Sequence, residues 1–179
     1  EKTIKRIIFV VGYPRSGTTF LSNLIYNKQK ISSIIFKYYP LINIPYTWSW
    51  FSNFYFGKNK IHRLQKDNIF YDINTAESLD EIYISRFLKE KKFKLLNESY
   101  SNNKLQTQYE KFLKKILILE KNNSLVIKNN YNILRIKYLN TIFPNSKFII
   151  MFRNPIRQIN SILRVNHILF SNNNKKTTE

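Results

Sequence analysis

A loop bounded by two glycines, directly after a short apolar run, carries the residue types best suited to chemistry in this chain. Gly12 and Gly17 enclose four residues, and Thr18 and Thr19 follow. Backbone N–H groups in such a loop, together with the positive end of a helix that starts there, bind anions. The order of strand, glycine loop and helix therefore predicts an anion site over residues 12–19.

The residue types inside this loop separate it from the loop of enzymes that use nucleoside triphosphates. The spacing is that of the phosphate loop G-x-x-x-x-G-K-[ST], but Thr18 stands where the lysine would reach the β- and γ-phosphates. Arg15 lies inside the loop instead, next to Ser16, and a guanidinium can make two hydrogen bonds with phosphate or phosphosulfate oxygens. The alternative is that the glycines serve only the turn between strand and helix.

Apolar runs and helical spacing alternate along the chain and predict the elements that position this loop. The predicted strands are 7–11, 31–36, 124–128 and 147–152. The predicted helices are 19–26, 79–87, 105–117, a helix over 132–143 capped by Asn132, and one capped by Asn154 with Pro155 at its first position. We expect a single domain over residues 1–179, an α/β fold with three α/β/α layers and a central parallel sheet.

Three groups of candidate residues follow the carboxyl ends of the predicted strands. The glycine loop follows the first strand, Lys128 ends the third, and Arg153 follows the fourth. Ligands of open parallel sheets bind at the carboxyl ends of the strands. We therefore expect these groups to converge on one site.

The segment 38–56 is unusual because it holds nine aromatic residues and no charged residue. Prolines and asparagines interrupt it, so we do not expect a transmembrane helix. We interpret it as a loop and short helix that cover the core, with an apolar wall for an acceptor or a surface that touches lipid as the alternative. The following stretch, 57–72, is polar and predicts a loop.

The composition indicates a basic globular protein with a net charge of +19, from 30 Lys and Arg against 11 Asp and Glu. Such a charge favours nucleic acid, but the cations are spread over the whole length without a readout element, so we expect no nucleic-acid partner. The chain has no cysteine and two histidines, so we expect no metal site. The first residues show no signal segment, which leads us to expect a cytoplasmic protein, although the chain does not begin with Met.

Residues 11–20, Val-Gly-Tyr-Pro-Arg-Ser-Gly-Thr-Thr-Phe, resemble the 5′-phosphosulfate loop of the sulfotransferase family. Members of that family use 3′-phosphoadenosine 5′-phosphosulfate (PAPS) as sulfuryl donor and release adenosine 3′,5′-bisphosphate (PAP). The Pro-Arg-Ser-Gly-Thr-Thr form is closer to the bacterial and tyrosylprotein branches than to the cytosolic steroid and phenol branch, which usually has Lys where Arg15 stands. The resemblance implies the P-loop-like sulfotransferase fold.

Residues 153–161, Arg-Asn-Pro-Ile-Arg-Gln-Ile-Asn-Ser, are similar to the 3′-phosphate motif of the same family. The resemblance implies that Arg153 and Ser161 hold the 3′-phosphate, the group that distinguishes PAPS from ATP. It also implies that Lys128 neutralises charge on the transferring sulfuryl group and the bridging oxygen. A cation is useful there because charge builds up on the leaving phosphate.

The general base is less directly indicated. The cytosolic branch has a histidine base near the position of Asn130, and asparagine cannot accept the proton. The segment Asn-Thr-Ala-Glu-Ser-Leu-Asp-Glu, which contains Glu77 and Glu81, looks like the Ser-Pro-Glu-x-x-x-Glu segment of some bacterial members, so Glu77 is the candidate catalytic base. The alternatives are that Glu77 forms a capping box with Asn74, or that His62 is the base.

The leading hypothesis is therefore a PAPS-dependent sulfotransferase that moves a sulfuryl group in line, without a metal, to a hydroxyl or amine of an unidentified acceptor. A phosphate-loop kinase is the first alternative, but the strand ends at Lys128 and Arg153 offer no acid for Mg²⁺. A basic module that binds nucleic acid or lipid is the second. Family members usually continue past the polar tail 171–179, so the resemblance leaves open that the chain is a fragment.

Overall fold

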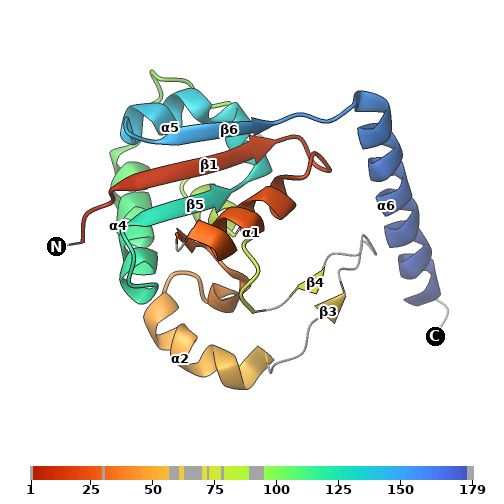
Figure 1. Cartoon of the computed structure of the whole chain (residues 1–179), viewed down its shortest axis with the longest axis horizontal. Coiled ribbons are helices and arrows are strands. Elements are labelled where there is room, and N and C mark those ends of the chain that lie inside the picture. The colour runs from red at the N-terminus through yellow and green to blue at the C-terminus, as the bar shows by residue number, and fades with distance from the viewer. Residues whose placement is uncertain are drawn as a thin grey trace.

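A four-stranded parallel sheet forms the centre of the computed structural model, as Figure 1 shows. Its strands lie in the order β2-β5-β1-β6. Their bounds are Ser32–Ser33 for β2, Ser124–Lys128 for β5, Arg6–Gly12 for β1 and Lys147–Met151 for β6. The structure describes residues 2–29, 31–56, 61–62, 70–71, 73–77, 79–88 and 95–176.

The register of the sheet brings the carboxyl ends of three strands to one edge. Val10 of β1 pairs with Lys128 at the end of β5, and Gly12 pairs with Met151 at the end of β6. The glycine loop, Lys128 and Arg153 therefore lie at the ends of neighbouring strands, as predicted from the order of the elements.

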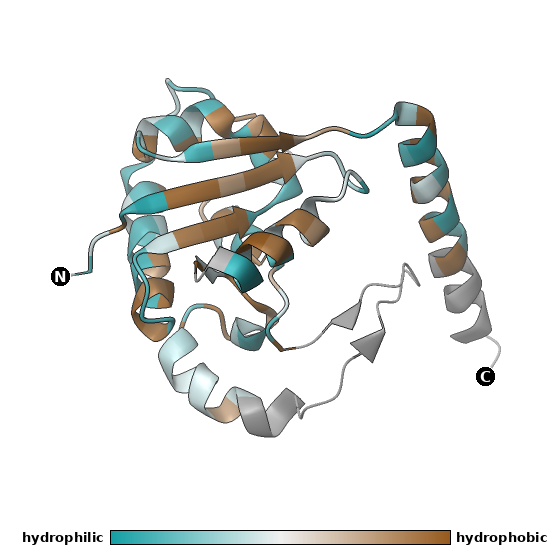
Figure 2. Ribbon diagram, viewed as in Figure 1, coloured by the Kyte–Doolittle hydropathy of each residue, from teal (hydrophilic) through white to brown (hydrophobic). Residues whose placement is uncertain are grey.

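Helices cover both faces of the sheet, which confirms the α/β fold with helices in outer layers. Helix α1, Thr18–Gln29, packs Leu21 and Ile25 against Val10 and Val126 on one face. The alternate residues of the same strands, among them Phe9 and Ile127, lie in the larger core on the other face. This division arises because successive side chains of a β-strand point to opposite faces of the sheet. Figure 2 shows the strands as a hydrophobic layer between these helices.

The second face is covered by helices α3, α4 and α5. Their bounds are Asp80–Ser85 for α3, Asn103–Leu119 for α4 and Ile136–Ile142 for α5. The predicted apolar stripe of α4 is confirmed, because all six of its members are buried: Leu105, Tyr109, Phe112, Leu113, Ile116 and Leu117. Asn102 caps this helix by accepting a hydrogen bond from Leu105 N at 2.9 Å.

Two of the predicted elements, a strand and a helix, have other bounds in the structure. The second strand keeps only Ser32–Ser33 of the predicted 31–36, because Ile35 pairs with Ala76 outside the sheet and the short helix η1, Phe36–Tyr38, begins there. The predicted helix 132–143 is split into η2, Asn130–Leu134, and α5, and the cap is Asn129 rather than Asn132. Tertiary contacts override local spacing in short elements of this kind.

The segment predicted as a loop over 57–72 contains two short strands, β3 at Ile61–His62 and β4 at Phe70–Tyr71. They pair in antiparallel register, with Ile61 opposite Tyr71. For the residues of this segment that the structure describes, the prediction of a loop is therefore wrong.

The aromatic segment forms a helix, α2 at Pro45–Phe56. Tyr38 and Ile42, which precede it, are buried in the main core, as the interpretation of a core cover requires. Trp50 and Phe51 within the helix are exposed, so that interpretation is wrong for these side chains. No helix in the described part of the chain combines the length and apolar character that crossing a membrane requires.

Helix α6, Pro155–Lys176, follows β6 and stands beyond the carboxyl ends of the strands in Figure 1. Asn154 caps it as predicted, by accepting a hydrogen bond from Arg157 N at 3.2 Å. Pro155 occupies the first helical position, where its missing N–H costs nothing. The start of α6 thereby comes next to the glycine loop.

Candidate functional site

The loop between β1 and α1 has a backbone that only certain residues allow. Gly17 has φ +97°, in the left-handed region that favours glycine. A Cβ built on Gly12 would lie 2.7 Å from Met151 O and 2.7 Å from Ser16 Oγ, closer than such atoms approach. The two glycines therefore shape the loop, and Gly12 also allows β6 to lie against it.

The interior of the loop is suited to an oxyanion. Ser16, Thr18 and Thr19 are buried where α1 begins. Ser16 Oγ is buried without a hydrogen-bond partner among the described residues. A buried hydroxyl of this kind normally has a partner, and phosphate oxygens accept hydrogen bonds at a helix N-terminus. The residues present therefore fit a phosphate group.

Helix α6 is attached to the loop by three hydrogen bonds. Arg15 Nε donates to Ser161 Oγ at 3.0 Å, and Arg153 donates through Nη1 to Arg15 O at 3.0 Å. Gln158 donates through Nε2 to Pro14 O at 2.7 Å. The two segments expected to hold the two ends of the nucleotide are therefore in direct contact, although they are more than 130 residues apart in the chain.

Lys128, at the end of β5, forms an ion pair with Glu77. Lys128 Nζ lies 3.0 Å from Glu77 Oε2, and the lysine side chain is only 7% exposed. A nearly buried pair of this type excludes most water and keeps both charges in place. The structure thus brings the predicted catalytic lysine and the candidate base together.

Glu77 reaches this position because the segment before α3 is held against α1. Asn23 of α1 accepts a hydrogen bond from Ala76 N at 2.8 Å and donates through Nδ2 to Thr19 O at 2.8 Å. Glu77 N donates to Ile34 O at 3.2 Å. Asn23 therefore connects the segment that carries Glu77 with the first turn of the helix behind the loop.

The alternative role of Glu77 as a capping-box residue is wrong. Helix α3 begins at Asp80, and its cap residue Leu79 makes no side-chain hydrogen bond to it. Glu77 lies three residues before that helix and points to Lys128 instead. Sequence spacing could not distinguish the two because a glutamate near a helix start serves either purpose.

A buried polar cluster lies behind this ion pair. Arg135 donates to Glu81 Oε2 at 2.6 Å and to Glu81 Oε1 at 2.9 Å. Asn129 Nδ2 donates to Asp80 Oδ1 at 3.1 Å and to Glu81 Oε2 at 3.0 Å, and Tyr109 Oη donates to Asp80 Oδ2 at 3.1 Å. Burial, together with the charge on Glu81, raises the pKa of Asp80 to about 6. The cluster joins α3, which follows Glu77, to the end of β5, which carries Lys128.

The sequence did not indicate that Asp80, Glu81 and Arg135 form a buried polar cluster. From the sequence, Asp80 and Glu81 would be interpreted as exposed acids in the first turn of a helix, and Arg135 would be interpreted as a cation on the surface. All three are buried. Asn130 was also missed as a structural residue. Thr18 Oγ1 donates to Asn130 Oδ1 at 3.1 Å, so this amide holds the start of α1 next to the end of β5.

Two hollows border the loop. One of about 310 Å³ is lined by Arg153, Ser161 and three neighbours on α6, Arg157, Asn160 and Arg164. The other, of about 430 Å³, lies between Tyr13 and Pro14 of the loop and five residues of the segment 129–134. The first is rich in arginine, and the second has mostly apolar walls with the amides of Asn129 and Asn130.

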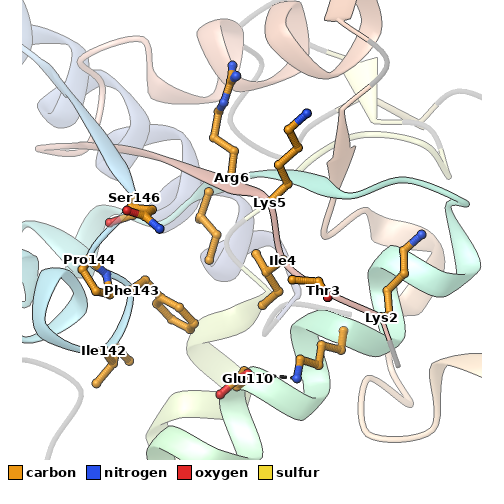
Figure 3. Close-up of a pocket in the computed structure, with 13 residues that line it drawn as sticks. Lys2, Thr3, Ile4, Lys5, Arg6, Glu110, Ile142, Phe143, Pro144 and Ser146 are labelled. Carbon is orange, nitrogen blue, oxygen red and sulfur yellow. Dashed lines mark ion pairs between the residues drawn. The ribbon is translucent and has the colours of Figure 1, made fainter.

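A third cavity, of about 320 Å³, lies at the opposite end of the sheet, where β1 begins and α5 ends. Figure 3 shows that Ile4 and Phe143 face its interior, whereas the side chains of Lys5 and Arg6 point away from Phe143. Lys114 is paired with Glu110 at 3.0 Å. This cavity lacks the loop and the converging cations, so we place the candidate site at the carboxyl ends of the strands.

A family model described as the sulfotransferase family matches residues 7–178. The chain belongs to the sulfotransferase family. No curated relative and no solved structure matches the chain. The match extends from the first strand into α6 and therefore includes every residue that the sequence indicated for the site.

Within this family member, most of the residues indicated by the sequence lie around the loop. The loop is formed by Arg15, Ser16, Gly17, Thr18 and Thr19. It is contacted by Arg153, which precedes α6, and by Ser161 of α6, and Lys128 pairs with Glu77 at the end of β5. Glu81 is turned to Arg135 instead. The side chain of His62 lies outside the described part of the structure.

Proposed function

We propose that this protein transfers a sulfuryl group from PAPS to a hydroxyl or amine of an acceptor and releases PAP. The observation that supports the proposal is that two cationic groups flank the strand that leads into the glycine loop. The Lys128–Glu77 pair lies at the end of β5, beside β1, and Arg153, which lines the arginine-rich hollow, donates to the loop at Arg15 O. A site for sulfuryl transfer needs both an anion cradle for the donor and a base for the acceptor. The family membership supports the same reaction class.

In this proposal the two ends of the donor are held by different elements. Ser16 to Thr19 and the first turn of α1 hold the 5′-phosphosulfate, with Arg15 beside it. Arg153 and Ser161 hold the 3′-phosphate, and the α6 hollow adds Arg157 and Arg164 to their charge. Arginine suits this task because its planar donors match phosphate oxygens.

The reaction then needs one proton transfer and one charge stabilisation. The acceptor oxygen or nitrogen forms a bond to sulfur while the bond from sulfur to the bridging phosphate oxygen breaks. Glu77 takes the acceptor proton, and Lys128 stabilises the negative charge that develops on the departing phosphate. The ion pair keeps both groups in place before the substrates bind.

The mostly apolar hollow beside the loop is the place we propose for the body of the acceptor. Tyr13 and Tyr131 can contact an apolar or ring-shaped surface, and Asn130 can position a polar group. Carbohydrate and lipid hydroxyls both fit such a wall. No nucleic-acid partner is part of the proposal.

The test of the donor is calorimetric titration with PAP, beside ATP with Mg²⁺, at moderate salt. We expect saturable PAP binding and weak ATP binding, because the arginine hollow selects a 3′-phosphate. Arg153→Ala should weaken PAP binding at least about tenfold, as loss of a charged hydrogen-bonding group does. Arg86→Ala removes another exposed arginine, at the end of α3, and serves as the matched control.

Two outcomes would overturn this proposal. Tight binding of ATP with Mg²⁺ and none of PAP would indicate the kinase alternative. Equal loss of PAP binding in Arg153→Ala and Arg86→Ala would mean that PAP is held only by the general positive charge, as expected for a basic binding module.

A further inference from the structure

Three aromatic residues in the described part of α2 lie on its outside, and a small polar residue lies on its inside. Tyr46, Trp50 and Phe51 are exposed by 41%, 74% and 54%, whereas Ser52 is completely buried. Residues four apart share one face of a helix, so Tyr46 and Trp50 lie together. This is the reverse of the usual arrangement of a helix that covers its own core. The three aromatic residues and the exposed apolar residues that precede them, Tyr39, Leu41 and Ile44, form a surface that we name the α2 surface.

Three hydroxyl groups and one indole of α2 make hydrogen bonds within the segment itself. Thr47 Oγ1 donates to Ile44 O at 3.2 Å, Ser49 Oγ to Tyr46 O at 2.9 Å, and Ser52 Oγ to Ser49 O at 2.9 Å. Trp48 Nε1 donates to Tyr39 O at 2.7 Å. Hydroxyl and indole donors that already have backbone partners lose little when water is replaced by a less polar medium.

The charged residues that neighbour α2 in the sequence have one sign. No charged residue lies between Lys37 and Lys58, which flank the helix in the sequence. From residue 2 to residue 66 the chain has 11 Lys and Arg and no Asp or Glu. The charged side chains in this third of the sequence would therefore all attract an anionic surface. Each cation close to such a surface adds to the binding free energy.

We propose that the α2 surface docks on the interface of an anionic lipid bilayer, with the helix lying in the plane of the interface. Tryptophan and tyrosine prefer this depth because their rings are apolar and their N–H or O–H groups are polar. In Figure 2 the first turns of α2 are pale, between hydrophilic and hydrophobic, so they lack the apolar character that a membrane-spanning segment needs. The occupant is a lipid surface, since its headgroups complement the flanking cations.

This docking is independent of the proposed sulfuryl transfer. In Figure 1, α2 lies below the sheet, away from the loop that follows β1. The ion pair of Lys128 with Glu77 and the contacts of α6 with the loop do not involve α2. Loss of docking should therefore leave binding of PAP unchanged.

The chain offers its own probe for this proposal, because its two tryptophans, Trp48 and Trp50, both lie in α2. We would add vesicles of phosphatidylcholine alone, or of phosphatidylcholine with phosphatidylserine, to the full chain and follow tryptophan emission and co-sedimentation. We expect a blue shift and co-sedimentation with the anionic vesicles, and weaker binding as salt is raised. Brominated lipids should quench the emission.

Two variants and a control test the surface itself. Trp50→Ser, which keeps Trp48 as reporter, and Phe51→Ser should each lower the vesicle partition coefficient at least about tenfold, because a large apolar side chain is lost. Phe152→Ser removes an aromatic side chain that is 80% exposed elsewhere and should leave the coefficient unchanged.

Three results would overturn the proposal. One is the absence of both co-sedimentation and a blue shift. Another is co-sedimentation without any change in tryptophan emission, which would place the contact on cations outside α2. The third is self-association in analytical ultracentrifugation that Phe51→Ser abolishes, since the α2 surface would then bind a second copy of the chain.

Discussion

Removal of the Arg135 guanidinium should destabilise the protein strongly although this residue is outside the loop. Arg135 is 1% exposed and makes two hydrogen bonds to Glu81, of 2.6 and 2.9 Å, while Asp80 lies beside Glu81 in the same buried cluster. Arg135→Met would keep much of the side-chain volume and leave two neighbouring carboxyl groups without their cation.

The expected cost is about 3–5 kcal/mol in the free energy of unfolding, as for other buried pairs that lose one partner. Two charge-assisted hydrogen bonds of about 1.5–3 kcal/mol each lead to a similar figure. Because domains are stable by only about 5–15 kcal/mol, the variant should unfold at a clearly lower urea concentration. Activity should fall as well, since α3 begins three residues after Glu77.

Urea unfolding at neutral pH, followed by circular dichroism, measures this effect. The double variant Arg135→Met with Glu81→Leu should be more stable than Arg135→Met alone, because it removes the uncompensated charge. Arg86→Met, at an exposed arginine, should stay within about 0.5 kcal/mol of the unmodified chain. The reasoning is refuted if Arg135→Met costs less than about 1 kcal/mol, or if the double variant is the less stable of the two.

Three further predictions concern the site and its surroundings. Because burial raises the pKa of Asp80 from its ordinary 3.8 to about 6, the folded state binds the proton more tightly than the unfolded chain. The free energy of unfolding should therefore fall by about 3 kcal/mol as pH rises from below 3.8 to above 6, and Asp80→Asn should remove this slope in urea unfolding at a series of pH values. Gly12→Ala should abolish binding of PAP in calorimetry, because its Cβ would lie 2.7 Å from the backbone oxygen of Met151, and binding like that of the unmodified chain would contradict the loop geometry. Glu77→Gln should lower kcat about 10²–10⁴-fold while affinity for PAP stays within about threefold, because a general base contributes to the chemical step alone; an unchanged kcat would exclude Glu77 as the base.

Local features of this protein could be predicted from the sequence with good success. The apolar run before Gly12, the two glycines and the amphipathic residues after them predict the strand, the loop and α1, and all three are present. The stripe of α4 and the capped start of α6 were predicted residue by residue. These features depend on backbone dihedral preferences and on periodicity, which act over a few residues.

Short elements were predicted less well. The predicted strand 31–36 is only two residues long in the structure, because Ile35 pairs with Ala76 outside the sheet. The predicted helix 132–143 is split into two helices, because its first residues contact the buried polar cluster. Which face of α2 is buried could not be predicted either. An almost uniformly apolar and aromatic helix has no polar face that would indicate which side is buried.

The sequence by itself determined which residues can hold an anion, because glycine spacing, Arg15 and the helix start are all local. Only the tertiary structure decided which partners complete the site. Lys128 meets Glu77 across 51 residues, and Arg15 meets Ser161 across 146, because the strands assemble in the order β2-β5-β1-β6 and bring their carboxyl ends to one edge. That order depends on the packing of whole elements against each other, which no local pattern specifies, and it also turned Glu81 away from the site toward Arg135.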